Sequence, residues 1–243
     1  MQSFLSIIAA LLVGTSLSAQ KAIQPGKNIV DASFLKEQHF SMDWFMRNGD
    51  AKKKVDSIDM VMLPTAQKFV VITQTRIEGV PSSWIDSSVC DLQTLRPIYH
   101  SSYNMQRNMV LRFGNPITGY YADKNSDKTD TINDSTTTPY FDSNLYIWLV
   151  TWLPLQQGSA YRIPLYDFNP KAKGVEYADV TDVKDSVFTS NKEGIRKIWR
   201  VTSRDHISGS DNQLTYFIDQ KDRRLWKLEI AIAGRKMEQI RVE

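Results

Sequence analysis

The sequence predicts a mainly β protein: one strongly curved antiparallel sheet, an open half-barrel, wrapped around a single buried helix. Three observations predict this fold. Short apolar segments recur about every ten residues between turn residues, which is typical of sandwiches and barrels. The segment from Leu214 to Glu243 alternates in polarity between two turns, so we expect a three-stranded antiparallel meander there. Only one segment has helical periodicity, and it is apolar nearly all round, as a buried helix is.

The expected strands follow one another with turn residues between them. The clearest is rich in β-branched residues and spans 66–77. Before the polar stretch at 123–139 we expect strands at 40–46, 54–63, 66–77, 82–91, 95–103, 107–113 and 117–122. The polar stretch itself holds at most two short strands around an exposed loop. After the helix we expect strands at 159–168, 175–189 and 194–202, followed by the closing meander, in which Trp226, Leu228, Ile230 and Ile232 form the inner row.

The helix is expected near 142–153. Its apolar residues follow the i, i+3, i+4, i+7 rule, at Leu145, Trp148, Leu149 and Trp152. Either Asp142 or Ser143 is suited to accept hydrogen bonds from the first free backbone amides, and Pro154 ends the helix. We therefore expect this helix to lie against the concave face of the sheet.

Residues 1–19 have the layout of a secretory signal peptide, with an apolar run from Leu5 to Gly14 and small residues before a cut ahead of Gln20. An uncleaved anchor or a core helix is the alternative, although the run is shorter than the roughly 20 residues that span a bilayer. The expected division is a signal peptide at 1–19, a loose polar lead-in at 20–38 and one β domain at 39–243.

The single cysteine, Cys90, excludes an internal disulfide, and an exported chain without disulfides fits the periplasm better than a eukaryotic secretory route. Extracellular release is the alternative. The net charge of +3 gives no reason to expect a nucleic-acid partner. We also expect no membrane-spanning segment after the signal peptide is removed.

The sequence predicts no catalytic residue and no cofactor. Its three histidines, His39, His100 and His206, lie far apart, and no metal-binding His or Cys motif, nucleophile elbow or Gly-rich phosphate loop occurs. Acidic pairs such as Asp56 and Asp59 have nothing that marks them as buried. An enzyme is therefore the third hypothesis, a hydrolase with a site that no motif reveals.

One spacing resembles a calcium loop. Oxygen-bearing side chains occupy the positions that an EF-hand uses, at Asp123, Asn125, Asp127, Thr129 and Asp134. Lys128 replaces the glycine of the sharp turn, and the flanks are expected strands rather than helices. We therefore favour a solvated polar loop and keep calcium binding as the alternative.

Aromatic residues are the remaining indication of a site. Ordinary core packing explains them, and the sharper hypothesis is an apolar groove beneath the helix that is open to a lipid or another hydrophobic molecule. The residues expected to line that cavity are Leu145, Trp148, Leu149, Trp152, Trp226, Leu228 and Ile230.

Three segments resemble the DUF3108-like family of exported bacterial proteins, which is similar in fold to the lipoprotein carrier LolA. They are the strand pair in 86–97, the helix and its flanks in 141–164, and the closing hairpin in 216–225. The resemblance implies a strongly curved antiparallel sheet around a helix and provides no catalytic residues. The polar stretch at 123–139 departs from the family pattern.

Three hypotheses follow for function. The first is an exported, non-catalytic binding or carrier module for a lipid or another hydrophobic ligand of the cell envelope. The second is a structural or protein-interaction component of the envelope whose cavity is plugged by its own helix, with Trp148 and Trp152 fully buried. The third is the hydrolase.

Overall fold

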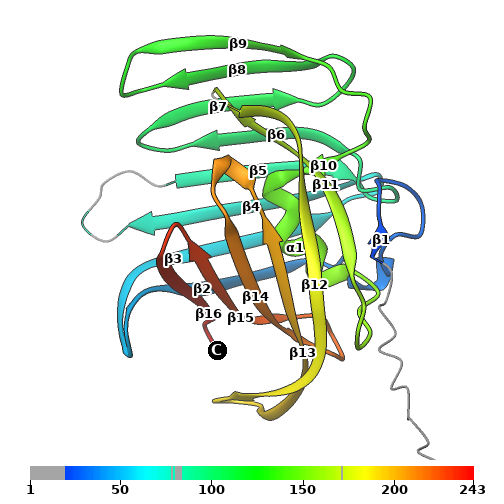
Figure 1. Ribbon diagram of the computed structural model, residues 1–243, viewed down its shortest axis with the longest axis vertical. Helices are drawn as coiled ribbons and strands as arrows, with labels where there is room; N and C mark the ends of the chain where they lie inside the picture. The colour runs from blue at the N-terminus through cyan, green and yellow to red at the C-terminus, as the bar shows by residue number, and fades with distance from the viewer. Residues whose placement is uncertain (1–19, 78, 80–83, 171) are drawn as a thin grey trace, which may run out of the picture.

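A single sheet of 16 strands dominates the computed structural model, which describes residues 20–77, 79, 84–170 and 172–243 (Figure 1). The predicted signal peptide at 1–19 lies outside the described residues. The strands are β1 (Lys21–Ala22), β2 (Gln38–Asn48), β3 (Ala51–Pro64), β4 (Lys68–Ile77), β5 (Trp84–Asp91), β6 (Pro97–Tyr103), β7 (Arg107–Arg112), β8 (Ile117–Asp123), β9 (Lys128–Asp134), β10 (Phe141–Asp142), β11 (Tyr161–Asn169), β12 (Ala172–Ser190), β13 (Gly194–Asp205), β14 (Asn212–Asp219), β15 (Leu225–Ile232) and β16 (Arg235–Arg241). The helical elements are the 3₁₀ turns η1 (Ala32–Phe34), η2 (Ser143–Leu145) and η3 (Ile207–Gly209), and the α-helix α1 (Tyr146–Trp152).

Two antiparallel meanders make up the sheet. Strands β2 to β9 form one and β11 to β16 form the other, and they join where β16 pairs with β2, with Arg241 opposite Met42. The outer edge of β11 carries β1 and β10, both parallel to it. The expected closing meander is confirmed as β14, β15 and β16.

The sheet curves until its two ends approach each other without pairing. Tyr166 and Phe168 of β11 pack in one apolar cluster with residues of β7, β8 and β9, namely Met109, Leu111, Ile117 and Ile132. The Tyr166 hydroxyl donates a hydrogen bond to Asp134 Oδ2 at 2.9 Å. Side chains therefore bridge the two ends, and the predicted open half-barrel is confirmed.

The inner face of each strand follows from the period of two. In β3, burial alternates from Val55 to Met62, and the buried residues are Asp56, Ile58, Met60 and Met62. These inner rows enclose the main core, which also holds the helix α1 (Figure 1). The predicted single buried helix is thus confirmed, and Asp142 caps its 3₁₀ entry by accepting from the Asn144 amide at 3.1 Å.

The lead-in at 20–38 is more ordered than expected. Strand β1 pairs with β11, and the Asp31 side chain caps η1 by accepting from the Ser33 amide. Ile23 and Leu35 are buried in the main core. Ile29, Val30 and Phe34 pack against the same core while partly exposed. These apolar side chains dock the segment, because fully burying a side chain such as Ile23 or Leu35 contributes about 1.5–3 kcal/mol. Among the described residues, no helix is both long and apolar enough to cross a bilayer.

Gly119 in β8 is expected to tolerate no side chain. A Cβ atom there would lie 1.9 Å from the carbonyl oxygen of Val110 in the neighbouring strand. We expect Gly119→Ala to lower the free energy of unfolding by about 1–3 kcal/mol, because one of the two strands must shift. Urea denaturation measures this. The control is Gly26→Ala, whose Cβ would meet its nearest atom at 3.8 Å, and equal stability of the two variants would contradict the prediction.

Candidate functional site

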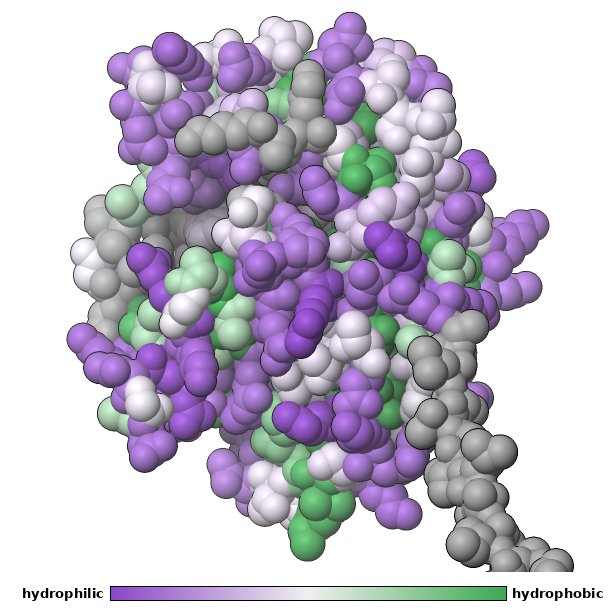
Figure 2. All heavy atoms as spheres, viewed as in Figure 1, coloured by the Kyte–Doolittle hydropathy of each residue, from purple (hydrophilic) through white to green (hydrophobic). Residues whose placement is uncertain are grey.

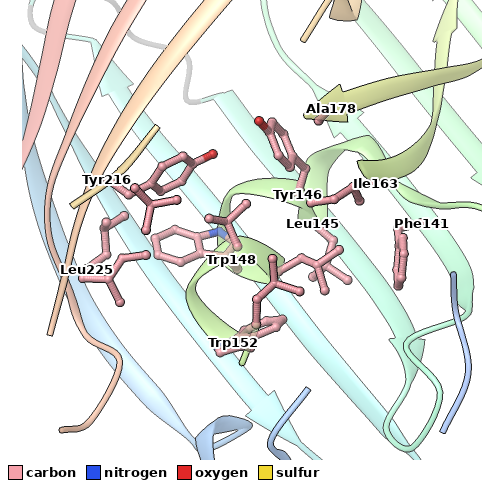
Figure 3. Packing of buried hydrophobic residues seen from close by; sticks show 14 of the residues in the cluster. Phe141, Leu145, Tyr146, Trp148, Trp152, Ile163, Ala178, Tyr216 and Leu225 are labelled. Atoms are coloured by element: carbon pink, nitrogen blue, oxygen red, sulfur yellow. The ribbon is translucent and has the colours of Figure 1, made fainter. Parts of the chain in front are cut away.

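The candidate site is the interior of the half-barrel, where α1 lies between the two meanders (Figure 3). On the side of β2 to β5, the ring of Phe40 meets Trp148 edge to face at 5.6 Å, and Phe69 meets Trp152 at 5.2 Å. On the other side, the core includes Tyr216 of β14 and Leu225 of β15. The apolar side chains of α1 thus occupy the volume that the curved sheet encloses.

Six of the seven residues predicted to line a cavity converge in this core. Their exposed fractions are 9% or lower, and they are Leu145, Trp148, Leu149, Trp152, Leu228 and Ile230. Trp148 is 7% exposed and Trp152 is 1% exposed. These residues therefore form a packed interior. The helix α1 fills the place where the sharper hypothesis from the sequence expected an open apolar groove.

Trp226 is the exception, and its predicted place in the inner row is wrong. A bulge interrupts the pairing of β14 with β15, so that Tyr216 lies opposite Leu228 while Ile218 lies opposite Leu225. The extra residue turns Leu225 toward α1 and Trp226 to the opposite face. There the indole stacks on Phe188 at 5.6 Å, in a cluster separate from the main core.

A buried polar cluster anchors the start of the helical segment. The Asp142 carboxylate lies 2.9 Å from His100 Nδ1 of β6 and accepts a hydrogen bond from the Ser88 hydroxyl of β5 at 2.5 Å. The Asn144 side chain in turn donates to Ser88 Oγ at 2.9 Å. Burial alone would lower the pKa of His100, but the charge and hydrogen bond of Asp142 outweigh it and raise that pKa. The cluster thus ties the helical segment to the sheet through a charged pair.

This cluster does not have the geometry of a nucleophilic triad. Such a triad places the nucleophile's hydroxyl at His Nε2, whereas Ser88 donates to the carboxylate and His100 Nε2 has no partner among the described residues. Cys90 is buried nearby, and burial raises the pKa of its thiol to about 12, so it is not a thiolate at neutral pH. The described residues contain no group of three or more His, Cys, Asp or Glu that is placed to hold a metal ion.

A second polar contact fixes the next turn of the segment. The Tyr146 hydroxyl at the start of α1 lies 2.5 Å from Ser203 Oγ of β13. The Tyr216 hydroxyl of β14 is buried without a partner among the described residues. The helix is therefore held to both meanders, to one through Asp142 and to the other through Tyr146.

Neither anchor follows from the sequence pattern, which predicts Asp142 only as a cap and Ser88, His100 and Tyr146 only as strand or helix residues. The sequence holds only a weak signal for the first anchor. Ser88 and His100 lie on strands that were expected to follow each other in the chain. It is the pairing register, which places the two residues opposite each other, that brings them together.

The calcium loop considered from the sequence does not form. Asp123 pairs with Lys128 at the turn of the β8–β9 hairpin, whereas Asp134 pairs with Ile117 at its far end. The seven residues of β9 separate the first and last expected ligands by about 20 Å at roughly 3.3 Å per residue. The side chains of Asp123, Asn125, Asp127, Thr129 and Asp134 therefore do not surround one ion. The stretch is the turn of the β8–β9 hairpin followed by strand β9, where a solvated polar loop was the favoured expectation.

A family model described as a protein of unknown function, DUF3108, matches residues 39–240. The chain belongs to the DUF3108 family. No curated protein matches it. A similar solved structure is the β-barrel-like protein of the domain of unknown function DUF1849 from Brucella abortus, with a TM-score of 0.54 and 9% identity over 86% of this chain and 97% of that one.

At 9% identity the likeness to the DUF1849 protein concerns the fold alone. It supports a barrel-like β architecture for this DUF3108 protein and transfers no residue role. The expected similarity to LolA stays a prediction.

Proposed function

We propose that this DUF3108 protein is an exported, non-catalytic binding module that takes up a hydrophobic molecule in the interior of its half-barrel. In the proposal, the segment of η2 and α1 is a plug that occupies the binding volume when no ligand is bound. Ligand binding displaces or shifts the plug, and the inner rows of the sheet then contact the ligand.

The observation that carries the proposal is the way in which the interior is filled. The apolar inner face of the curved sheet is covered by an α-helix of seven residues that has no side-chain cap of its own. Isolated helices shorter than about 12–15 residues are marginal in water, so packing against the sheet is what keeps α1 folded. A ligand that offers the sheet an equivalent apolar surface competes directly with that packing.

A second candidate is a protein-interaction component of the envelope with a permanent plug. The near-complete burial of Leu149 at 0% and Trp152 at 1% favours it. Hydrogen exchange distinguishes the two candidates. A permanent plug exchanges its α1 amides only when the whole protein unfolds, whereas a displaceable plug exchanges them through a local opening of lower free energy.

Uptake of a fluorescent lipid by the purified protein tests the proposal, together with native mass spectrometry of the protein as isolated. We expect saturable uptake of one lipid per chain. Tyr146→Phe should speed uptake about fivefold, because the lost hydrogen bond to Ser203 contributes about 1 kcal/mol. The matched control is Tyr103→Phe, whose side chain is 38% exposed on β6. A protein that carries no hydrophobic molecule and takes up no lipid would rule the proposal out.

The proposed location is the periplasm. It rests on the apolar run in residues 1–19 and on the absence of disulfide-forming cysteine pairs from the sequence. Cell fractionation of the full-length chain, with N-terminal sequencing of the product, tests both export and the expected cut before Gln20. Recovery of an unprocessed chain in the cytoplasm would contradict it.

A further inference from the structure

Two arginines beside the interior differ from the other cations near them. Arg223, in the turn between β14 and β15, has Nε and Nη1 buried without a hydrogen-bond partner among the described residues, and Arg241 at the end of β16 has Nη1 in the same condition. Neither guanidinium is within ion-pair distance of a carboxylate in the part of the chain that the structure describes. Both side chains reach solvent in part, although the unpaired nitrogen atoms themselves are covered in this state.

The neighbouring cations make the contact that Arg223 and Arg241 lack, an ion pair with a carboxylate. Arg224 makes a bidentate contact with Glu193 at 2.5 and 2.8 Å, and Arg196 Nε lies 2.9 Å from Asp219. On the next strands, the carboxylate of Glu238 is shared by Arg47, Lys52 and Lys227. Because the nearby carboxylates are already engaged, Arg223 and Arg241 have no equivalent partner within the chain.

Both unpaired guanidinium groups border the apolar core. Arg241 lies over the Phe40 ring at 3.8 Å, and Phe40 contacts Trp148 of α1. Arg223 lies over the Phe34 ring of η1 at 5.1 Å, and Phe34 packs against the same core. Burial lowers the pKa of Arg241 to about 10, with a further contribution from the charge of Arg224, and burial also lowers that of Arg223.

Leaving a cation partly buried without an anion costs free energy, and an anionic group that arrives with a ligand would recover it. The charge of Asp31, which makes no ion pair with Arg223, compensates that burial only in part. An apolar core that leads to two unpaired guanidinium groups matches the two parts of an amphipathic anion.

We propose that Arg223 and Arg241 bind the anionic headgroup of the hydrophobic ligand, a carboxylate or a phosphate, whose apolar chain lies along Phe34, Phe40 and Trp148. This inference rests on the function proposed above and narrows the ligand to an anionic amphiphile. Guanidinium forks suit both oxyanions because they donate two parallel hydrogen bonds.

Calorimetric titration with four probes tests this inference: dodecanoate, dodecyl phosphate, uncharged dodecanol and inorganic phosphate. We expect the purified protein to bind both anionic amphiphiles at least about tenfold more tightly than dodecanol, the ratio that about 1.4 kcal/mol produces. The double variant Arg223→Gln/Arg241→Gln should lose that preference and keep its affinity for dodecanol. The control, Arg204→Gln/Arg235→Gln, removes the same charge from two exposed positions and should behave as the wild type.

The outcomes separate the two proposals. Equal affinity for the charged and uncharged amphiphiles overturns the headgroup inference and leaves the binding function standing. Binding of inorganic phosphate alone, with no gain from the apolar chain, makes the ligand a free anion and also overturns the inference. Binding of none of the probes rules out both proposals. The wild-type comparison decides between these results even where the double variant does not fold.

Discussion

Replacing Trp152 by alanine should lower the free energy of unfolding by about 3–5 kcal/mol, the range for large aromatic side chains removed from cores. Trp152 is 1% exposed and packs edge to face on Phe69 at 5.2 Å. Its removal takes away the main contact at the end of α1 and leaves a cavity that the strands of a continuous sheet are poorly able to close. The seven-residue helix α1 has no side-chain cap of its own and is too short to be stable alone, so we expect a loss in the upper part of this range.

Urea denaturation followed by circular dichroism measures this loss, and the dependence on urea shows whether unfolding stays two-state. Trp152→Phe keeps an aromatic contact with Phe69 and should recover about half of the loss. The control is Ile195→Ala, at a position that is 76% exposed, where we expect a change of no more than about 0.5 kcal/mol. A loss at Trp152 as small as that at Ile195 would show that α1 is not packed in the interior.

The parts of this fold that the sequence predicts are those set by local periodicity. The alternation from Lys227 to Ile232 and the i, i+3, i+4, i+7 pattern around Trp148 each indicate which side chains are buried without reference to other segments. The lead-in was misjudged because its apolar residues, among them Ile23 and Leu35, follow neither a strand nor a helix period. Their burial depends on a surface that only the folded sheet provides.

The candidate site was predictable only in part, because it too depends on contacts between segments that lie far apart in the sequence. The residues of α1 were identified from their spacing, but Trp226 was assigned to the wrong face because a bulge shifts the parity of β15 by one residue. The contact of His100 with Asp142 spans two segments far apart in sequence, and the unpaired state of Arg223 and Arg241 depends on which carboxylates other cations have already engaged. No local pattern in the chain records either fact.

The contact between His100 and Asp142 gives the second large effect on stability. Asp142→Ala should lower the free energy of unfolding by about 3–5 kcal/mol, the cost of leaving one member of a buried ion pair without its partner. His100 and Asp142 are 5% and 2% exposed, and the variant also deprives Ser88 of its acceptor. The chain contains a matched control in the surface pair His206–Asp211, with side chains 70% and 90% exposed. Asp211→Ala should cost at most about 1 kcal/mol.

The pH dependence of stability separates a charged His100–Asp142 pair from a neutral hydrogen bond. The pKa of His100 is raised above its ordinary value of 6.5, so the folded protein holds this proton more tightly than the unfolded chain does. The resulting stabilisation is fully present below about pH 6.5 and is lost as the pH rises through the folded-state pKa. In Asp142→Asn, burial becomes the dominant influence on His100 and lowers its pKa, so the variant should instead lose stability as the pH falls.

Urea denaturation from pH 5 to 9, with an NMR titration of the His100 ring, measures how the stability of each protein changes with pH. Equal slopes in the two proteins would show that the pair carries no charge and that a neutral hydrogen bond anchors α1.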